Sequence, residues 1–346
     1  MEVDRDDFGV RQAEMTARWY ENVKKNHPDV EAYIRTRHDA YLGRWSEAAR
    51  FMENGAKILD IGGGNIFPRL VDFFKQKHFL YSYLDVDPAC VDGSRALAES
   101  MDLKGANFDH GYNDSLPFGD GAFDAIFSSH CLEHSFDLKK TFNEVNRVLR
   151  PGANLTMAVP FGWEENPEHP YFFGPSEWIA LITDAGFRVR VAQIGCEYPE
   201  SGHDYFVAAQ KQSAVGTFRI DPSNYTKSEF DFISPFDARI QYSGNADHRA
   251  DHVIMADDRW SITFDPPAGV REVLPILLRH DWSGVVEINW GRKNAREDCY
   301  SWFTYPQPIR IESDPKDAGA PVQIAVAGKN PASFSKQGVL HGILVR

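Results

Sequence analysis

The chain has 346 residues, of which 42% are hydrophobic and 25% charged, a composition typical of a globular protein with a buried core. Its formal net charge of −13 argues against a broad surface that binds phosphates, so we expect no nucleic acid partner. There is no apolar run of the roughly 20 residues that a membrane span needs, and the acidic N-terminus lacks a signal-peptide pattern. Four cysteines stand far apart with no CxxC pair, which favours reduced thiols and a cytoplasmic location.

The first part of the chain, residues 11–54, has apolar residues at helical spacing and predicts helices that stop at Asn54-Gly55. Strands and helices then alternate. The predicted strands are AKILDIGGG (56–64), HFLYSYLDV (78–86), GANFDH (105–110), FDAIFSS (123–129), ANLTMAVP (153–160), RVRVAQIG (188–195) and DYFVAAQKQ (204–212). The helices predicted between them cover 66–77, 88–100, 137–150, with Asp137 as the cap, and 176–186. This alternation predicts an α/β fold with a doubly wound, mostly parallel sheet.

From about residue 213 the helical signals fade and short β-rich runs follow one another between turns. The runs are RIQYSG (239–244), RWSITFD (259–265), SGVVEINWG (283–291), SWFTYP (301–306), PVQIAVAG (321–328) and GVLHGILVR (338–346). They predict a β-sandwich, jelly-roll-like, as a further domain. We therefore expect a helical cap at 1–54, an α/β domain at 55–212 and a β-rich domain at 213–346.

Glycines 62–64 follow the first predicted strand of the α/β domain, where a backbone without Cβ atoms can approach a ligand closely. A dinucleotide fingerprint would need another glycine at position 67, but Phe67 stands there. Asp60 precedes the glycines and places a carboxylate near the expected position of a ligand's ammonium group. Asp85 ends the second strand, and its two oxygens suit the two hydroxyls of a ribose.

These segments resemble the class I S-adenosylmethionine-dependent methyltransferases over roughly residues 55–211. The matching pieces, in order, are ILDIGGG, YLDVDP, SLPFGDGAFDAIFSSHCLEH, FNEVNRVLRPGANLTMAVP, DAGFRV and YFVAAQK. The resemblance implies an enzyme that binds S-adenosylmethionine. The residues it implies at the cofactor are Asp60, Gly62, Gly63, Gly64, Asp85, Val86, Tyr112, Asn113, Asp114, Ser129 and His130. The chain departs from the family at Tyr112, where an acid is frequent, and at Ile66, where a third glycine is common.

The stretch His130-Cys131-Leu132-Glu133-His134 also has the H-x-x-E-H spacing of zinc peptidases. That chemistry needs both histidines on one helix face, whereas here the stretch follows a predicted strand and precedes the helix signal at Asp137. We therefore expect a turn beside the cofactor and no metal. Histidine has the pKa that suits removal of a hydroxyl proton, so His130, His134 and His169 are candidate bases.

The acceptor pocket is expected to be built by the N-terminal helices and the loop 161–174, with the β-rich domain as an optional further contributor. Its candidate residues mix aromatic faces with polar groups: Tyr20, Arg37, His38, Tyr41, Trp163 and Tyr171. Such a surface suits O-methylation of a saccharide or another small polar acceptor. A non-catalytic binding or assembly module, whose β-domain binds a glycan or a protein, remains the alternative. Asp247-His248 and Asp251-His252 are interpreted as a charged turn, and an oligomer stays possible.

Overall fold

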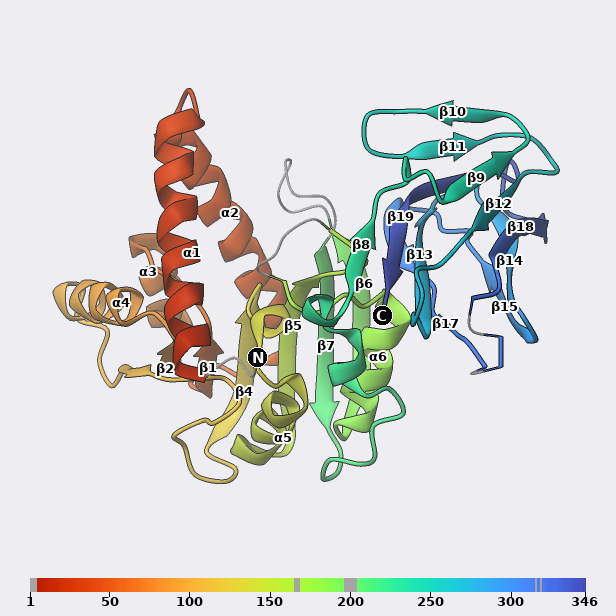
Figure 1. Ribbon diagram of the computed structural model, residues 1–346. Coiled ribbons are helices and arrows are strands. Elements are labelled where there is room, and N and C mark those ends of the chain that lie inside the picture. The colour runs from red at the N-terminus through yellow and green to blue at the C-terminus, as the bar shows by residue number, and fades with distance from the viewer. Residues whose placement is uncertain (1–4, 165–168, 196–203, 315, 318) are drawn as a thin grey trace. The chain divides into compact units, whose positions relative to one another are not determined.

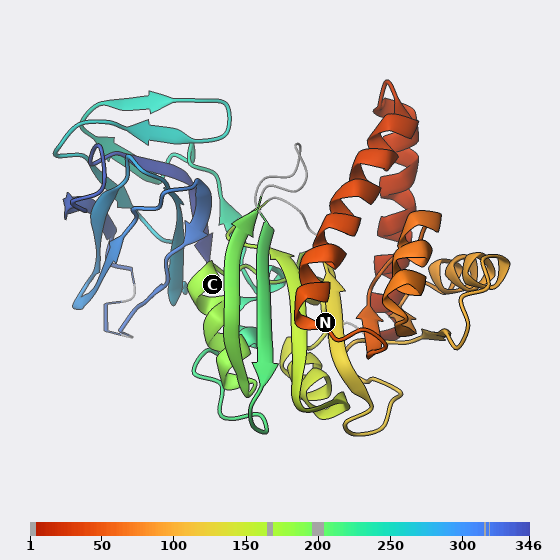
Figure 2. The same ribbon diagram turned by 180° about the vertical axis from the view of Figure 1, so that it is seen from behind.

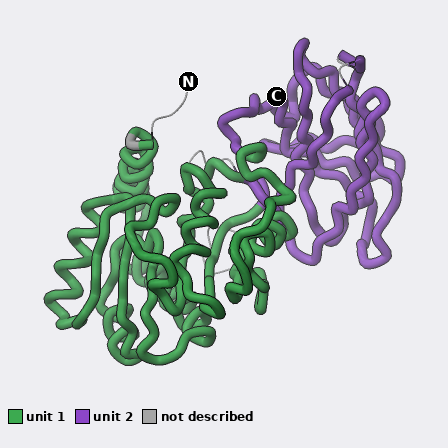
Figure 3. The backbone as a smooth tube through the Cα atoms, turned by 90° about the horizontal axis from the view of Figure 1, so that it is seen from below, with its two compact units in different colours: residues 1–161, 167–171, 175–225 green, residues 162–166, 172–174, 226–346 purple. Residues whose placement is uncertain are grey.

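The computed structural model describes residues 5–164, 169–195, 204–314, 316–317 and 319–346, so Cys196 lies outside the described part. The chain forms two compact units, coloured separately in Figure 3. The first contains residues 1–161, 167–171 and 175–225, and the second contains 162–166, 172–174 and 226–346. Within the described part, no helix is both long and apolar enough to cross a membrane.

A seven-stranded sheet in the order β3-β2-β1-β4-β5-β7-β6 forms the centre of the first unit (Figure 1). Its strands are β1 (Lys57–Ile61), β2 (Leu80–Asp85), β3 (Asn107–His110), β4 (Phe123–Ser129), β5 (Leu149–Pro160), β6 (Phe187–Gly195) and β7 (Asp204–Lys211). The pairs from β3 to β5 are parallel, whereas β7 runs antiparallel to both β5 and β6. The predicted doubly wound α/β fold is therefore confirmed.

The helices of this unit begin and end at residues with a clear physical role. They are α1 (Arg5–Asn26), α2 (Val30–Ala48), α3 (Pro68–Lys77), α4 (Pro88–Ser100), α5 (Leu138–Val148) and α6 (Pro175–Asp184), with 3-10 turns η1 (Ala49–Phe51), η2 (Leu132–His134) and η3 (Pro222–Tyr225). Carboxylates of Asp29, Asp87 and Asp137 cap α2, α4 and α5 by accepting hydrogen bonds from backbone N–H groups of their first turns. The predicted cap at Asp137 is thus confirmed.

Aromatic side chains hold α2 and α3 against the sheet. Trp45 of α2 is fully buried, and its ring lies 4.8 Å from that of Phe74 on α3 and 4.1 Å from that of Phe127 on β4. Tyr81 of β2 stacks on Phe74 from the sheet side. This core fixes α2 beside β1, β2 and β4, and α1 runs alongside α2 in both views (Figures 1 and 2).

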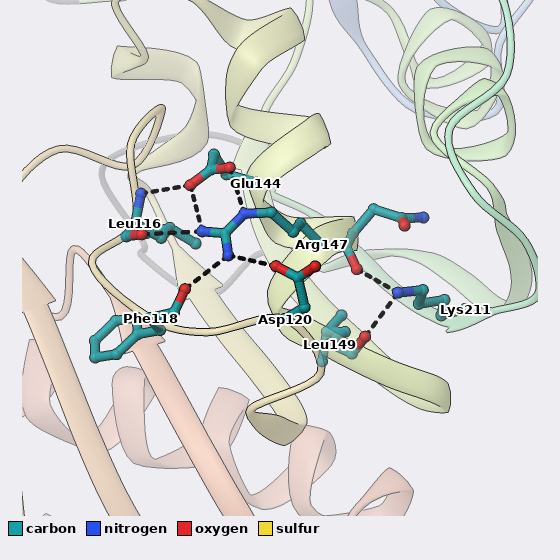
Figure 4. A network of polar contacts seen from close by, with 8 residues as sticks. Leu116, Phe118, Asp120, Glu144, Arg147, Leu149 and Lys211 are labelled. Atoms are coloured by element: carbon teal, nitrogen blue, oxygen red, sulfur yellow. Dashed lines mark hydrogen bonds and ion pairs between the residues drawn. The ribbon is translucent and has the colours of Figure 1, made fainter.

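Arg147 on α5 organises the loop that precedes β4 (Figure 4). Its guanidinium forms two hydrogen bonds of 2.7 Å with Glu144 and donates to the carbonyl oxygens of Leu116 and Phe118. Glu144 in turn accepts the N–H of Leu116 at 2.8 Å. Hydrogen bonding to Arg147 holds the pKa of Glu144 below its usual value. The Leu116-Pro117-Phe118 segment is therefore fixed by backbone contacts to one arginine.

Two antiparallel sheets build the second unit. One contains β8 (Asp231–Ile233), β10 (Ala246–His248), β11 (Val253–Met255), β13 (Glu272–Arg279), β16 (Tyr305–Pro308), β17 (Ile311–Glu312) and β19 (Gly338–Val345), and the other contains β9 (Ile240–Ser243), β12 (Ser261–Phe264), β14 (Gly284–Trp290), β15 (Lys293–Asp298) and β18 (Val322–Lys329). A short turn, η4 (Lys227–Glu229), precedes them. Buried side chains from both sheets form a single apolar core, which confirms the predicted sandwich of β-strands.

Several details of the second unit differ from the sequence prediction. Strand β13 was not predicted, and the segment 301–304 lies outside any strand because pairing in that run begins only at Tyr305. Asp247 and His248 lie in strand β10, and only Asp251 and His252 belong to the connection to β11. The expected division of the chain into a helical cap, an α/β domain and a β-rich domain, with bounds at 54 and 212, stays a prediction.

Candidate functional site

A cavity of about 320 Å³ lies within the first unit, at the carboxyl ends of β1, β2 and β4. This is the edge at which open parallel sheets bind their ligands. The helices α1 and α2 form the opposite wall. The lining residues outside these helices are Ile61, Gly62, Gly63, Gly64, Asn65, Phe67, Leu84, Asp85, Val86, Asp87, Cys90, Gly111, Tyr112, Asn113, Ser129, His130, Cys131, His134 and Phe136.

Each of the two helices presents one face to this cavity. From α1 the lining residues are Phe8, Gln12, Thr16, Trp19 and Tyr20, and from α2 they are Ile34, Arg37, His38 and Tyr41. Both sets recur at intervals of three and four residues, the spacing of one helix face. The guanidinium of Arg37 lies 4.6 Å from the ring of Trp19, a cation–π distance. The helical wall therefore combines aromatic surface with a positive charge.

The glycine loop adopts a backbone that only glycine enters readily. Gly62 and Gly64 have φ of +70° and +58°, in the left-handed region. A Cβ on Gly62 would lie 2.3 Å from Sγ of Cys131, and one on Gly63 would lie 2.6 Å from Oδ2 of Asp60. The loop is thus packed closely from beneath, and its backbone is open to the cavity.

Asp85 links the end of β2 to this loop. Its Oδ2 accepts a hydrogen bond from the N–H of Gly64 at 3.1 Å and another from the hydroxyl of Tyr83 at 3.1 Å. Its Oδ1 accepts from the N–H of Asp87 at 2.9 Å. Burial raises the pKa of Asp85, and these donors counteract that effect. The carboxylate borders the cavity in a fixed orientation and retains further acceptor capacity.

Asp60 does not line the cavity. Its side chain is fully buried beneath the loop, where it accepts a hydrogen bond of 2.8 Å from the hydroxyl of Tyr81 and weaker ones from Tyr41. Burial raises the pKa of Asp60 to about 7, although the Tyr81 hydroxyl acts in the opposite direction. The carboxyl of Asp60 therefore packs under the glycines and changes its protonation state near neutral pH.

In the segment after β3, Tyr112 and Asn113 border the cavity, whereas Asp114 does not. Asp114 forms an ion pair with Arg5 of α1, and the same guanidinium lies 4.4 Å from the ring of Tyr112. Asn113 donates to Oγ of Ser135 at 3.0 Å and accepts from the hydroxyl of Thr141. The start of α1 is thereby tied to the loop after β3.

His130 follows β4 directly, with φ of +52°, and its N–H donates to the carbonyl of Ala158. Its Nε2 lies 2.9 Å from Oδ1 of Asp204, and the other oxygen of Asp204 is paired with the buried guanidinium of Arg44. Burial lowers the pKa of His130. Burial would raise the pKa of Asp204, but His130 and Arg44 outweigh it and hold that pKa below its usual value. The imidazole is therefore kept neutral and oriented at the cavity wall.

A second imidazole at the wall, His134, lies beside the buried carboxyl of Glu133. The distance from Glu133 Oε1 to His134 Nε2 is 3.9 Å, and that to Nε2 of His169 is 4.0 Å. The rings of His134 and His169 meet at 4.5 Å between their centroids. Burial raises the pKa of Glu133 to about 8. The side chains of His134 and His169, the two other candidate bases, thus both lie near the Glu133 carboxyl.

The structure brings most of the residues predicted from the sequence together. Those at the cavity are Gly62, Gly63, Gly64, Asp85, Val86, Tyr112, Asn113, Ser129, His130 and His134, with Tyr20, Arg37, His38 and Tyr41 from the helices. Asp60, Asp114 and His169 lie outside its lining, as do Trp163 and Tyr171. Ile66, the second departure from the family, is buried in the core, with its N–H donated to Ser94 Oγ.

Sequence reasoning missed the face of α1 apart from Tyr20, and it missed the pair Arg44–Asp204. The first left a signal, since Phe8, Gln12, Thr16 and Trp19–Tyr20 share helical spacing, although polar residues interrupt the apolar stripe. The second left almost none. Arg44 is one charged residue in an ordinary helix, and its partner lies 160 positions further along the chain.

Comparison with known proteins agrees with this geometry. The family model described as "Methyltransferase domain" matches residues 59–157, which contain the glycine loop, Asp85 and the stretch from β4 to β5. This segment is a class I methyltransferase domain. The cofactor typical of such a domain is S-adenosylmethionine, as the resemblance implied.

Individual relatives of the methyltransferase domain are distant. An uncharacterized protein, YafE, of Escherichia coli (strain K12) is 30% identical over 119 residues, which cover 30% of this chain and 58% of that protein. An uncharacterized methyltransferase of Mycobacterium sp. (strain KMS) is 32% identical over 165 residues, covering 46% and 63% of the two chains. The chain therefore spans about three fifths of the length of these curated relatives.

Among solved structures, the methyltransferase domain is similar to the Burkholderia thailandensis 1,6-didemethyltoxoflavin-N1-methyltransferase with bound 1,6-didemethyltoxoflavin and S-adenosylhomocysteine. The TM-score is 0.47 and the identity 16%, and the match covers 62% of this chain and 92% of that one.

Proposed function

We propose that this protein transfers a methyl group from S-adenosylmethionine to a hydroxyl of a small polar acceptor. The observation that carries the proposal is the composition of a single cavity. One wall consists of the glycine loop and Asp85, and the other consists of the inward faces of α1 and α2. A cofactor and an acceptor can therefore meet in one cavity, which in-line methyl transfer requires.

The residues at the first wall fit the cofactor. The open backbone of Gly62–Gly64 suits the methionine part, Asp85 offers carboxylate oxygens to the ribose, and Val86 supplies an apolar surface for the adenine. Tyr112 and Asn113 stand where the adenine edge is expected. Asp60 and Asp114 are better understood as supports, because both carboxyls are engaged by other side chains. When bound, S-adenosylmethionine supplies a methyl carbon already activated by the adjoining sulfonium.

His130 is the residue we favour as the proton acceptor. Its Nε2 faces the Asp204 carboxylate, which favours a proton on that nitrogen and leaves Nδ1 as the basic one. Its lowered pKa keeps it neutral at physiological pH, as a base must be. His134 borders the same cavity, and all three imidazoles lie near Glu133, with His130 Nδ1 at 3.5 Å from its Oε1. What distinguishes His130 is the Asp204 carboxylate on its other nitrogen.

Saccharides are the acceptor class that we propose first. Sugar rings pack their C–H faces on aromatic side chains and hydrogen-bond through their hydroxyls. Trp19, Tyr20 and Tyr41 offer such faces, and Gln12 and Arg37 offer donors beside them. The helical wall alone provides this surface, so the proposal does not require the β-rich unit to contact the acceptor.

Calorimetric titration of the full chain with S-adenosylmethionine, S-adenosylhomocysteine and NAD is the test. We expect the first two to bind and NAD not to bind. Asp85→Asn should weaken both by about 10- to 100-fold, because a neutral amide loses the charge-assisted hydrogen bonds to the ribose. The matched control is Asp92→Asn on α4, whose carboxylate is exposed and pairs with Arg95.

A methyl-transfer screen that begins with sugars then tests the acceptor. Equal affinity of native protein and Asp85→Asn would contradict the cofactor assignment. Tight binding without transfer to any hydroxyl compound would instead favour the alternative of a binding module. Transfer to an amine but no alcohol would contradict the hydroxyl acceptor and leave the cofactor site intact.

A further inference from the structure

Glu133 is a buried carboxyl without a hydrogen-bond donor from another residue. It is 1% exposed, and within the part of the chain that the structure describes only its own backbone N–H acts on its oxygens as a donor. Leaving an ionised carboxylate buried without donors costs several kcal/mol, so such a group is either protonated or paired with a cation. The groups nearest to it are the imidazoles of His130, His134 and His169. The charges of Arg44 and Asp204 also act on it but are paired with each other, and their effects on the pKa of Glu133 are opposed.

We propose that Glu133, His134 and His169 form a binding site for a divalent transition metal ion, with Zn²⁺ as the best match. One ligand atom from each residue lies within 4.8 Å of the others. Donors bound to tetrahedral zinc at about 2.0–2.2 Å lie about 3.3–3.6 Å apart. The 3.9 Å and 4.0 Å separations from Glu133 Oε1 to the two histidines therefore need only small side-chain movements to reach that geometry.

The donor set decides which ions suit the site. Two imidazole nitrogens and one carboxylate oxygen favour zinc and its neighbours in the first transition row, whereas Mg²⁺ and Ca²⁺ prefer sites made of oxygen alone. Three protein ligands also leave a coordination position for water or a substrate oxygen. His134 borders the cavity, and the side chains of His134 and His169 are 21% and 12% exposed, so an ion could reach the site from solvent.

This site differs from the peptidase arrangement that the sequence pattern suggested. Glu133 and His134 lie in the short turn η2, so the first histidine of the pattern does not share a helix with the second. His130 instead directs its Nε2 to Asp204. The third ligand is His169, from the segment between β5 and α6, 35 positions after His134.

A second histidine–carboxylate group supplies an internal control. Asp251, His252 and His341 of the second unit also place ligand atoms within 4.8 Å of one another. The side chain of Asp251 is 71% exposed and already bonded to His252 Nδ1 at 2.7 Å. That group has no buried carboxyl in need of a cation, so we expect at most weak binding there.

The test is calorimetric titration of the full chain, first freed of metal with a chelator, with ZnCl2 and separately with MgCl2. We expect one equivalent of Zn²⁺ per chain and no binding of Mg²⁺. Glu133→Gln and His169→Ala should each weaken zinc binding by at least about 100-fold, whereas His252→Ala should leave it unchanged. Cobalt absorption in the visible range, read on the same variants, reports whether nitrogen ligands surround the ion.

S-adenosylmethionine titrations of each variant show whether it is folded, since neither Glu133 nor His169 lines the cavity. Loss of zinc binding with cofactor binding retained supports the site. The proposal would be overturned if the native chain bound no zinc, or if all variants bound zinc with equal affinity. It would also be overturned if only His252→Ala lost zinc binding. The proposal does not rest on the methyl transfer, because the readout is metal binding itself.

Discussion

Asp60 shows how a single side chain near the site responds to its surroundings. It is fully buried between the glycine loop and Tyr81, and its pKa rises to about 7 from a usual value of 3.8. Between these two values the folded chain holds a proton on Asp60 that the unfolded chain has released. The free energy of unfolding contributed by this residue therefore falls as the pH rises from about 4 to about 7.

We expect this effect to be absent from Asp60→Asn, whose amide does not titrate but can still accept from Tyr81. The unfolding free energy of the native chain, relative to that variant, should fall by about 2 kcal/mol between about pH 5 and about pH 7. Urea unfolding of both proteins across this range measures the difference. A difference that stays constant with pH would show that Asp60 is ionised throughout.

From the sequence it could be predicted that Asp60 lies near the end of a strand, but not whether its side chain is buried or borders the cavity. Asp60 and Asp85 were both expected at strand ends because the hydrophobic runs before them are clear. Only the structure shows that Asp85 faces the cavity and that Asp60 lies under the loop. Asp60 is paired with Tyr83 of β2, two positions before Asp85 on the same face of the sheet. The difference therefore arises from the position along the strands, because Asp85 stands at the carboxyl end of β2 whereas Asp60 lies one level lower, where Gly63 covers it.

At the scale of elements, α1 and α2 are the helices that close the cavity, and two glycines in them provide a matched comparison. A Cβ on Gly9 of α1 would lie 2.6 Å from the hydroxyl of Tyr112, whereas a Cβ on Gly43 of α2 would meet nothing within 4 Å. Alanine is favoured over glycine within a helix by about 1 kcal/mol. The two positions therefore separate helix propensity from contact with the site.

Gly43→Ala should raise the free energy of unfolding by up to about 1 kcal/mol and leave cofactor affinity unchanged. Gly9→Ala should gain less stability, because its methyl group displaces the Tyr112 ring, and it should weaken S-adenosylmethionine binding several-fold. Thermal unfolding and calorimetry on the two variants give both quantities. Identical behaviour of the two substitutions would argue that α1 does not fix Tyr112.

Among the strands, β13 illustrates why a segment escaped prediction. Pro275 lies within it and cannot donate to a neighbouring strand, so the run 272–279 lacks an ordinary strand signal. In the sheet, Pro275 pairs with Ile343, and its carbonyl still accepts from the N–H of Ile309. The apolar side chains around it are buried, and that burial outweighs the missing donor.

For the whole molecule, the division into units does not follow the order of the chain. Residues 162–166 and 172–174 belong to the second unit, although they lie between β5 and α6 of the first. The ring of Trp163 lies parallel to that of Phe232 at 6.0 Å, and Phe172 packs on Phe230 at 5.9 Å. Lys227 also donates to the carbonyl of Glu164 at 2.7 Å.

A fragment ending at residue 225 would lose these partners. We expect it to self-associate and to unfold at a lower temperature than the full chain, since each large aromatic side chain left exposed forfeits about 1.5–3 kcal/mol of burial. Replacing both Trp163 and Phe172 by serine in the fragment should restore a monomer. Size-exclusion chromatography and thermal unfolding distinguish the outcomes, and a stable, monomeric unmodified fragment would contradict the expectation.

The sequence by itself determined the alternation of strands and helices, the glycine loop, Asp85 and the methyltransferase resemblance. These features depend on side-chain periodicity and on backbone conformations that particular residues favour locally, so they can be predicted from spacing alone. The tertiary structure decided which face of α1 closes the cavity and which partners Arg44, His130 and Glu133 meet. Asp204 and His169 reach those partners because the chain returns to the same sheet edge after β5, and the spacing of residues along a sequence does not encode that return.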